Sequence, residues 1–489
     1  MHARERSERR WLAGLLVLAA LFWCFDLALL RAAVPDPLDD TWEYGVTARH
    51  LLAGDGFCTD VIHPPLWSLR DARSTVPVLV HGPLLPILIV PQVALEGSRA
   101  IDSVGWLAAA AAWIAAWLTF RLGARLFGPA VGAAAGGLFT LAPLTVRAVN
   151  HDPSLLVGAA LLLAALDALT RARRAPGRAG WSAAMAGLAL GLAALARAEM
   201  LIAAVVLLPL AGRRGAPAFL AGLLICVLPW WIHNARATGQ PFFNLSSYLL
   251  IGYSRERPGL SVLRDFALSP VRFPHALRDA LPGLPAKWAE CFPRALKRAL
   301  LAPTGGTGWL APIGAALALG GRTESAPRPS RRVALLLSTL ALIPIAIMTL
   351  TVYDSRYLTP FLPLWALAAC RGAEALSNAL PPWGRRPRAW IGVLLLALVP
   401  SVAPALKEAE HDARGFEQRL ASERAALRAM ADGSRRLIVS DTPDFVAFTT
   451  GRPVVWMTEA EFRGAPGAPG WPFPVPAADR WFHGATRVE

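Results

Sequence analysis

The feature that most constrains this chain is the recurrence of apolar runs of about 20 residues, the length that crosses a bilayer as a helix. Of its 489 residues, 55% are hydrophobic, and a soluble domain would not repeat such runs. The sequence therefore predicts an α-helical polytopic membrane protein with about eleven transmembrane helices. The first run follows the basic segment MHARERSERR and lacks a small-residue cleavage site, so we expect an uncleaved membrane helix.

The positive charge of the chain predicts how these helices are oriented. The formal net charge is +15, which can indicate nucleic-acid binding. Here, however, the arginines cluster in short loops between apolar runs, as the positive-inside rule requires, and no nucleic-acid partner is expected. We expect a bacterial cytoplasmic (inner) membrane protein with a cytoplasmic N-terminus and an extracytoplasmic C-terminal domain. The basic loops that fall on one side include 171–178, 213–214, 320–332 and 383–388.

The predicted domain organisation has two parts. Residues 1–404 form the transmembrane domain, with large outer loops at 34–100 and 235–300. Residues 405–489 combine a helical stretch with short β-branched runs, which is typical of a small α/β extracytoplasmic domain. The helical stretch is expected at 408–433, and the strands in RLIVSD, FVAFTTG and RPVVWM.

The first outer loop carries the most informative stretch, Pro35 to Phe57. It opens with Asp39 and Asp40 and then has the pattern of an amphipathic helix that ends at Gly54. Such a helix lies on a membrane surface and would hold its acids over whatever the spans enclose. The same acids also fit a capping box that starts the helix, so both interpretations remain open. One face of this helix presents Asp40, Glu43, Thr47 and His50.

Two apolar segments are not single membrane spans. Segment 81–95 contains three prolines, which favours a second juxtamembrane or re-entrant element. Run 181–212 is too long for one helix and is interrupted at Arg197-Ala198-Glu199, so we expect two spans that meet at the outer face. Arg197 and Glu199 are not spaced as helical ion-pair partners, and Arg197 is expected to need other ligands.

Ionisable residues gather on the predicted outer side, and at membrane depth such residues are costly and usually functional. Two of them also have plain structural interpretations: Asp152 precedes Pro153 as a helix start, and Arg356 follows the end of a span. Together, acids and cations at a membrane surface fit group transfer from a lipid-linked phosphate. The outer set comprises Asp39, Asp40, Glu43, His50, His63, His81, Asp152, Arg197, Glu199, His233, Arg236, Asp354 and Arg356.

An ordered set of motifs runs through nearly the whole membrane region. It consists of Asp39-Asp40-x-x-x-Tyr44 with Ala48-Arg49-x-Leu51 and Gly54-x-Gly56-Phe57, HGPLLP (81–86), Asp152-Pro153, GLAALARAEMLI (191–202), LPWWIHNARATGQPF (228–242) and SRYLTPFLP (355–363). This set resembles the GT-C superfamily of polyprenyl-phosphate-sugar glycosyltransferases. It is most similar to bacterial relatives of dolichyl-phosphate-mannose–protein mannosyltransferase and of the lipid A aminoarabinose transferase.

The resemblance implies roles for the acids. Asp40 would be the catalytic base, with Asp39 as the competing choice, because the family often has Asp-Glu where this chain has Asp39-Asp40. Asp39 or Asp152 would orient the acceptor or a divalent metal. The implied metal ligands are Asp40, Asp152 and Glu43.

The resemblance also implies a donor phosphate site made of Arg356, His81 and Arg197. The usual Pro-Pro-Leu of the second juxtamembrane segment is Gly82-Pro83-Leu84 in this chain, whereas an intact His63-Pro64-Pro65-Leu66 occurs earlier and competes for the role of His81.

The predicted activity is inverting transfer of a hexosyl or pentosyl group from a polyprenyl-phosphate-sugar donor to a glycan, lipid or protein acceptor. A multi-pass transporter or lipid flippase is the alternative, although the chain lacks the repeats with paired broken helices that transporters often show. A non-catalytic scaffold is disfavoured by the paired acids. A disulfide between Cys58 and Cys291, both in predicted outer loops, is a further open question.

Overall fold

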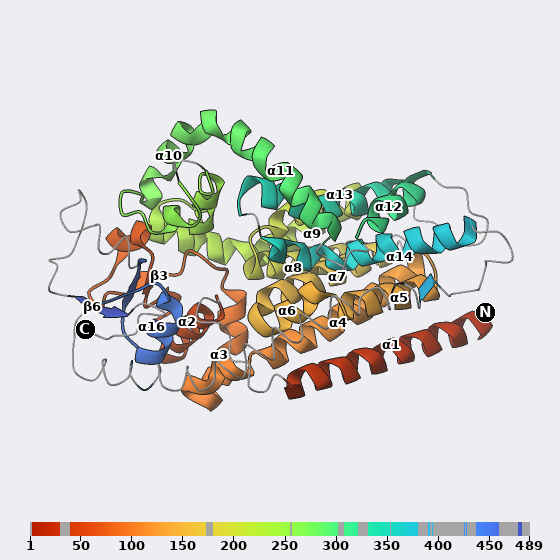
Figure 1. Cartoon of the computed structure of the whole chain (residues 1–489), viewed down its shortest axis with the longest axis horizontal. Helices are drawn as coiled ribbons and strands as arrows, with labels where there is room; N and C mark the ends of the chain where they lie inside the picture. Colours follow the sequence, from red (N-terminus) through yellow and green to blue (C-terminus); the bar gives the residue numbers. More distant parts are fainter. Residues whose placement is uncertain are drawn as a thin grey trace.

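The computed structural model describes residues 2–29, 40–172, 179–254, 257–301, 308–320, 331–352, 354–379, 437–458 and 478–481, together with residues 390, 391, 394, 425 and 427. The molecule is elongated, with a helical bundle at one end and a small sheet with its covering helices at the other (Figure 1). Helix α1 begins at the far end of the bundle, and the last described strand belongs to the sheet.

The bundle consists of helices whose axes run along the long dimension of the molecule (Figure 1). They are α1 (His2–Leu29), α4 (Gly105–Leu126), α5 (Pro129–Thr140), α6 (Pro143–His151), α7 (Pro153–Ala172), α8 (Ala179–Ala196), α9 (Met200–Thr238), α12 (Leu310–Gly320), α13 (Arg331–Leu350) and α14 (Leu362–Ala379). Among the residues described, five helices are long and apolar enough to cross a membrane, or six if α5 and α6, bent by 55°, form one span. The predicted span 389–404 lies almost wholly outside the described residues.

The run 181–212 breaks where the sequence predicts. Helix α8 ends at Ala196 and α9 begins at Met200. Within α9, Gly212 has a non-helical backbone (φ 69°, ψ 170°), and the residues after it return alongside α8. A Cβ at Gly187 would lie 1.9 Å from the carbonyl oxygen of Phe219, so these two backbones touch. Small residues at such crossings allow membrane helices to approach closely.

The first outer loop folds over the end of the bundle. Helix α2 (Thr41–Ala53) ends at Gly54, which has a left-handed backbone (φ 83°), as expected. Helix α3 (Leu84–Glu96) is too short to span a bilayer, in agreement with the prediction for 81–95. Between these helices lie β1 (Cys58–Thr59), β2 (Val61–Ile62), the 3-10 turn η1 (Pro64–Leu69) and β3 (Val76–Pro77).

The C-terminal segment forms a parallel sheet with a strand of the first outer loop. The strand order is β2, β5 (Val454–Trp456), β4 (Leu437–Ser440) and β6 (Ala478–Trp481). The predicted strands in RLIVSD and RPVVWM are confirmed as β4 and β5, but FVAFTTG is a helix, α16 (Pro443–Thr450), rather than a strand. Thr442-Pro443-Asp444 starts this helix, because proline suits the first helical position and an acid is favoured in the first turn. The predicted helix 408–433 lies outside the described part except at residues 425 and 427.

The second outer loop covers the bundle from another side. It contains the short turns η4 (Leu245–Leu250), η5 (Ser261–Leu263), η6 (Pro270–Arg272) and η7 (Leu281–Gly283), and helices α10 (Phe273–Ala280) and α11 (Leu284–Leu301). The ammonium group of Lys287 on α11 donates to the carbonyl oxygens of Leu249 and Leu250 (both 2.9 Å) and of Leu350 (3.0 Å). This buried lysine therefore holds α11 against η4 and the end of α13.

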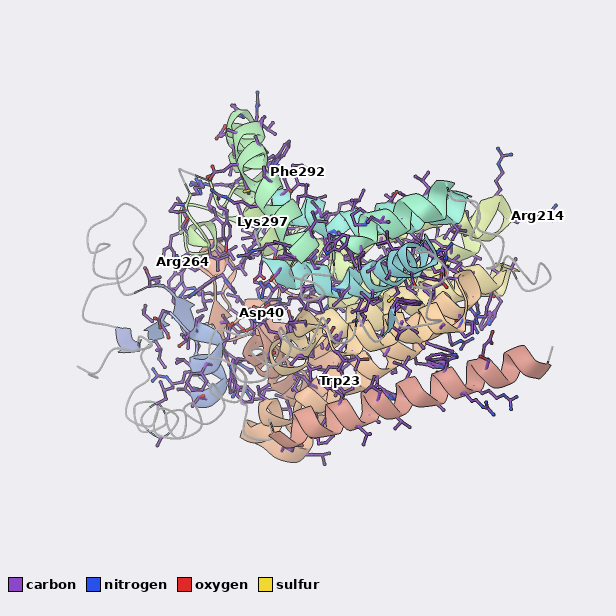
Figure 2. The ribbon with its side chains drawn as sticks, turned by 45° about the vertical axis from the view of Figure 1, so that its right-hand side comes forward. Trp23, Asp40, Arg214, Arg264, Phe292 and Lys297 are labelled. Carbon is purple, nitrogen blue, oxygen red and sulfur yellow. The ribbon has the colours of Figure 1, made fainter. Side chains whose placement is uncertain are left out.

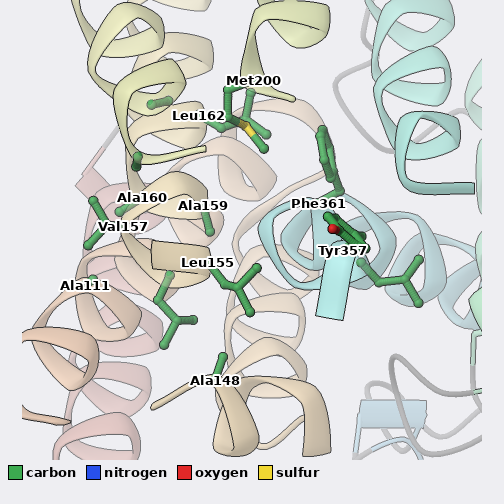
Figure 3. Close-up of a cluster of buried hydrophobic side chains, with 14 of the residues drawn as sticks. Ala111, Ala148, Leu155, Val157, Ala159, Ala160, Leu162, Met200, Tyr357 and Phe361 are labelled. Atoms are coloured by element: carbon green, nitrogen blue, oxygen red, sulfur yellow. The ribbon is translucent and has the colours of Figure 1, made fainter. Parts of the chain in front are cut away.

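An apolar core fixes the 3-10 turn η8 (Ser355–Phe361) against the bundle. Tyr357 and Phe361 of η8 lie close to Leu155 on α7 and to Met200 at the start of α9 (Figure 3). This packing positions η8, and with it Arg356, next to the start of α7. No disulfide joins the two outer loops, since Cys58 and Cys291 are both free thiols.

Candidate active site

A polar cavity of about 390 Å³ lies where the outer loops, the bundle and the C-terminal segment meet. Asp40 lies at this junction, and Arg214 lies at the opposite end of the bundle (Figure 2). The lining comes from segments far apart in the sequence: Asp40, Glu43, Tyr44, His63, His81, Arg197, Glu199, Asn244, Ser246, Tyr253, Asp354, Arg356, Tyr357, Asp441, Thr442, Asp444 and Trp456, with apolar residues between them. Asp39 lies outside the described residues.

Asp40 occupies the position before helix α2, but its carboxylate does not cap the helix: within the described chain it makes no capping hydrogen bond. It instead accepts from Nη1 of Arg356 at 3.4 Å. Burial raises the pKa of Asp40, yet the charges of Arg356, His81 and Arg197 outweigh this effect and lower the pKa below its usual value. Asp40 is therefore a carboxylate at neutral pH, facing the cavity.

Glu43, one helical turn further along α2, is only 2% exposed and is held by two histidines. Its Oε2 lies 3.1 Å from Nε2 of His81 and 3.9 Å from Nε2 of His63. Burial raises the pKa of Glu43, but the two imidazoles outweigh burial and lower the pKa to about 2. For His81, burial lowers the pKa, whereas Asp40 and Glu43 together raise it to about 9. His81 is thus a cation at neutral pH, and both histidines that the motifs singled out reach the same acid.

Asp152 and Arg197 form a second charged pair beside the cavity. Nη1 of Arg197 lies 3.1 Å from Oδ2 of Asp152 and donates to Oγ of Ser154 at 3.0 Å. Nε of Arg197 also pairs with Glu199, so the expectation that Glu199 would not be a partner is wrong. The helix is broken between α8 and α9, and residues two apart can meet there although they cannot on a helix.

Arg356 projects from η8 into the cavity and is 40% exposed. Its Nε lies 3.4 Å from Oδ2 of Asp354 but makes no hydrogen bond within the described residues. Asp40 raises the pKa of Arg356 further above its usual value, more than burial lowers it. A guanidinium with one side turned to a carboxylate and spare donors is suited to an incoming phosphate.

Two residues of the predicted helix face do not reach the cavity. His50 lies between Asp55 (3.1 Å) and Asp60 (3.2 Å), and the hydrogen bond with Asp60 is the largest cause that raises the pKa of His50 to about 10. Thr47 is buried inside the protein. Arg49, which belongs to the first-loop motif, donates to carbonyl oxygens of α16 rather than to the cavity.

The sequence did not single out Asp444, which enters the cavity from α16. Burial raises the pKa of Asp444 well above its usual value, and the neighbouring charges of Glu43 and Asp40 raise it further. The only local signal was the helix start Thr442-Pro443-Asp444, and nothing in it indicates a neighbour 400 positions away. Asp441 and Trp456 reach the cavity from the same segment.

The three predicted metal ligands are each paired with a cation of the protein. Across the described ranges, no group of three or more His, Cys, Asp or Glu side chains is arranged to hold a metal ion. Each predicted ligand also faces a cation of the protein: Asp40 faces Arg356, Glu43 faces His81, and Asp152 faces Arg197. A divalent ion would have to displace these cations or lie among them, which is electrostatically unfavourable.

Solved structures share this architecture. ArnT from Cupriavidus metallidurans bound to undecaprenyl phosphate aligns with a TM-score of 0.56 at 13% identity, over 92% of this chain and 86% of ArnT. The oligosaccharyltransferase AglB from Archaeoglobus fulgidus, in complex with an inhibitory peptide and a dolichol-phosphate, aligns with a TM-score of 0.56 at 13% identity, over 91% of this chain and 64% of AglB. A mutant arabinofuranosyltransferase AftD from Mycobacteria aligns with a TM-score of 0.51 at 16% identity, over 92% of this chain and 33% of AftD.

By sequence, no family model and no curated protein matches the chain. At these identities the structural similarity shows the fold alone. The three neighbours are GT-C glycosyltransferases. This chain shares their fold, and it has several apolar helices of membrane-spanning length. The structure of this chain is therefore that of a polytopic membrane protein with the GT-C glycosyltransferase fold, as the motifs of its outer loops predicted.

Proposed function

We propose that this chain is a membrane glycosyltransferase that moves a sugar from a polyprenyl-phosphate donor to an acceptor hydroxyl at the extracytoplasmic face. The observation that carries the proposal is the pairing of Asp40 with Arg356 inside one cavity. A base for the acceptor and a cation for the leaving phosphate are the two groups that this reaction needs, and here they lie side by side.

The donor phosphate is proposed to bind at Arg356 and Arg197, with His81 adding a third positive charge. The side chain of Arg356 is 40% exposed, and both guanidinium groups line the cavity. Polyprenyl phosphates also occupy two of the neighbours with this fold, undecaprenyl phosphate in ArnT and a dolichol-phosphate in AglB. The isoprenoid tail would stay in the bilayer beside the bundle while its head group enters the cavity.

The proposed reaction is a single inverting displacement. The acceptor hydroxyl gives its proton to Asp40, and its oxygen forms a bond to the anomeric carbon of the donor sugar. The bond between that carbon and the phosphate oxygen breaks, and its electron pair leaves with the phosphate, whose charge Arg356 and Arg197 stabilise. No step uses a metal.

Arg356 would couple donor binding to the strength of the base. In the unliganded cavity, the arginine holds the pKa of Asp40 low, which makes the carboxylate a weak base. A bound phosphate shares the positive charge of Arg356, so the pKa of Asp40 rises. The base would thus become effective only once the donor is in place.

The charge distribution supports an extracytoplasmic cavity. Asp152 lies beside the cavity at the start of α7, and Arg171 lies at the other end of this 20-residue helix, roughly 30 Å away. There, Arg121, Arg125 and Arg171 surround the buried Asp167. A basic end opposite the cavity agrees with the positive-inside rule.

Mass spectrometry of a deletion strain tests the proposal. Glycans and glycolipids of the deletion strain are compared with those of its parent and of a strain complemented with the wild-type chain. Loss of one glycosylated product, restored by complementation, is the expected result. An unchanged glycan and glycolipid profile, together with lipid flipping by the purified chain in vesicles, would instead identify a flippase.

A further inference from the structure

The cavity has two chemically different walls. Arg356 and Arg197 lie on the wall formed by the bundle. The C-terminal segment forms another part of the lining with Asp441, Thr442, Asp444 and Trp456, none of which is a cation. A phosphate is attracted to the two arginines, and the four C-terminal lining residues offer it no positive charge. The C-terminal wall must therefore serve a different part of the reaction.

This wall is fixed to the helix that carries the base. The indole of Trp42 on α2 packs edge-on against Phe445 of α16, with ring centroids 5.1 Å apart. The guanidinium of Arg49 donates to the carbonyl oxygens of Phe448 (2.8 Å) and Ala447 (3.0 Å), which lie near the end of α16. Strand β2 of the first outer loop also pairs with β5. The position of Asp444 relative to Asp40 is thus set by several independent contacts.

Two carboxylate oxygens of cavity-lining residues, one on α2 and one on α16, are buried without hydrogen-bond partners. Oε1 of Glu43 and Oδ1 of Asp444 accept no hydrogen bond from any described residue. Glu43 is 2% exposed, and a buried oxygen without a donor is costly. A ligand that supplies several hydrogen-bond donors would remove this cost.

The remaining features of the wall fit a carbohydrate. Burial and the charges of Glu43 and Asp40 raise the pKa of Asp444, and its carboxyl oxygens can accept hydrogen bonds from a hydroxyl group. Trp456 adds an aromatic ring next to His63, at a ring-centroid distance of 5.3 Å, and the guanidinium of Arg264 lies over the same ring, 5.2 Å from its centroid. An aromatic wall with a few buried polar groups is the usual composition of a small-molecule site.

We propose that Glu43, Asp444 and Trp456 form the acceptor subsite and that the group bound there is a sugar with several free hydroxyls. The proposal rests on the proposed function and names its acceptor class. A peptide acceptor is less well matched, because extended peptides are recognised along sheet edges and open grooves through repeated backbone hydrogen bonds. A cavity of about 390 Å³ that must also hold the donor sugar suits a ring-sized group.

Saturation-transfer NMR on the full chain in lipid nanodiscs tests the proposal. The probes are a panel of methyl hexosides and pentosides and, for comparison, N-acetyl-serine and N-acetyl-threonine methylamides, each with undecaprenyl phosphate present. We expect a methyl glycoside to bind the wild type and to bind Asp444→Ala about five- to tenfold more weakly, the effect of one lost hydrogen bond. Asp444→Asn, which keeps an acceptor oxygen at the same position, should bind within about twofold of the wild type.

Asp279→Ala is the matched control, because Asp279 is an exposed acid on α10 away from the cavity lining. It should leave glycoside binding unchanged. The proposal is overturned if no glycoside of the panel binds, if only the amino-acid amides bind, or if Asp444→Ala binds as well as the wild type. Loss of binding in Asp444→Asn to the level of Asp444→Ala would contradict the proposed hydrogen bond from the glycoside to this side chain.

Undecaprenyl phosphate binding to the same samples separates the two proposals. It should be equal in the wild type and both Asp444 variants, which also shows that the variants are folded. If the wild type binds no undecaprenyl phosphate, the proposed function itself is wrong. If it binds the lipid but no glycoside, only the acceptor inference fails.

Discussion

Asp40 and Arg356 are 316 positions apart in the sequence, yet the carboxylate of one lies 3.4 Å from the guanidinium of the other. Asp40 stands at the start of α2, and Arg356 projects from η8, which the apolar core fixes against α7. Neither side chain caps the element that it belongs to. Within the described chain, Asp40 makes no capping hydrogen bond to α2, and η8 is capped by Asp354. The pair is therefore best explained by chemistry in the cavity rather than by local structure.

Arg356→Gln should weaken binding of undecaprenyl phosphate about 10- to 100-fold, because a hydrogen bond to a charged group contributes about 1.5–3 kcal/mol. The affinity can be measured by native mass spectrometry of the purified protein with this lipid. Arg214→Gln removes the same charge at the opposite end of the bundle (Figure 2) and should have no effect. Equal losses of affinity in both variants would mean that lipid binding depends on the net charge of the protein rather than on this cavity.

The pair of His81 and Glu43 should make stability fall at alkaline pH. The pKa of His81 rises from 6.5 to about 9 in the folded protein, so its contribution is fully present below pH 6.5 and is lost as the pH rises to about 9. The thermal midpoint of the wild type in detergent should therefore decrease over this range more steeply than that of His81→Gln. Parallel pH profiles of the two proteins would show that His81 does not hold a proton in the folded state.

Gly45→Ala should separate α2 from α16. A Cβ at Gly45 would lie 2.6 Å from Cδ1 of Ile101 and 2.7 Å from Cε2 of Phe448, and such overpacking costs about 1–3 kcal/mol. We expect a lower thermal midpoint and lower transfer activity. Gly158→Ala on α7 is the matched control, because an added Cβ there meets nothing within 4 Å and alanine favours a helix. A Gly45→Ala protein as stable and active as the control would argue against a tight junction.

Much of this site could be predicted because its parts are marked locally. The amphipathic pattern before Gly54 set the position of Asp40 and Glu43, and the break at Arg197 followed from an apolar run too long for one helix. Charged residues at the ends of apolar runs are unusual, so Arg197 and Arg356 stood out from their neighbours. The topology predicted only that these residues lie on one side of the membrane, and the structure places Asp40, Glu43, Arg197 and Arg356 around one cavity.

The contribution of the C-terminal segment could not be predicted in the same way. Strand β2 has only two residues, Val61 and Ile62, which is too short for a periodic pattern. Its partner β5 lies almost 400 positions later, and parallel pairing over that distance leaves no local signal. The run FVAFTTG has strand-forming composition, but tertiary packing of Phe445 and Phe448 on Trp42 favours a helix. Asp444 was missed for the same reason.

Substitution of the proposed base tests the mechanism most directly. The glycosylated product in the deletion strain is quantified by mass spectrometry after complementation with the wild type, Asp40→Asn or the surface control Asp279→Asn, at equal protein levels. Asparagine cannot accept the proton of the acceptor hydroxyl, so Asp40→Asn should lose about 10²- to 10⁴-fold in transfer while the control keeps full activity and all three proteins bind undecaprenyl phosphate. Wild-type levels of product from Asp40→Asn would contradict the assignment of Asp40 as the base.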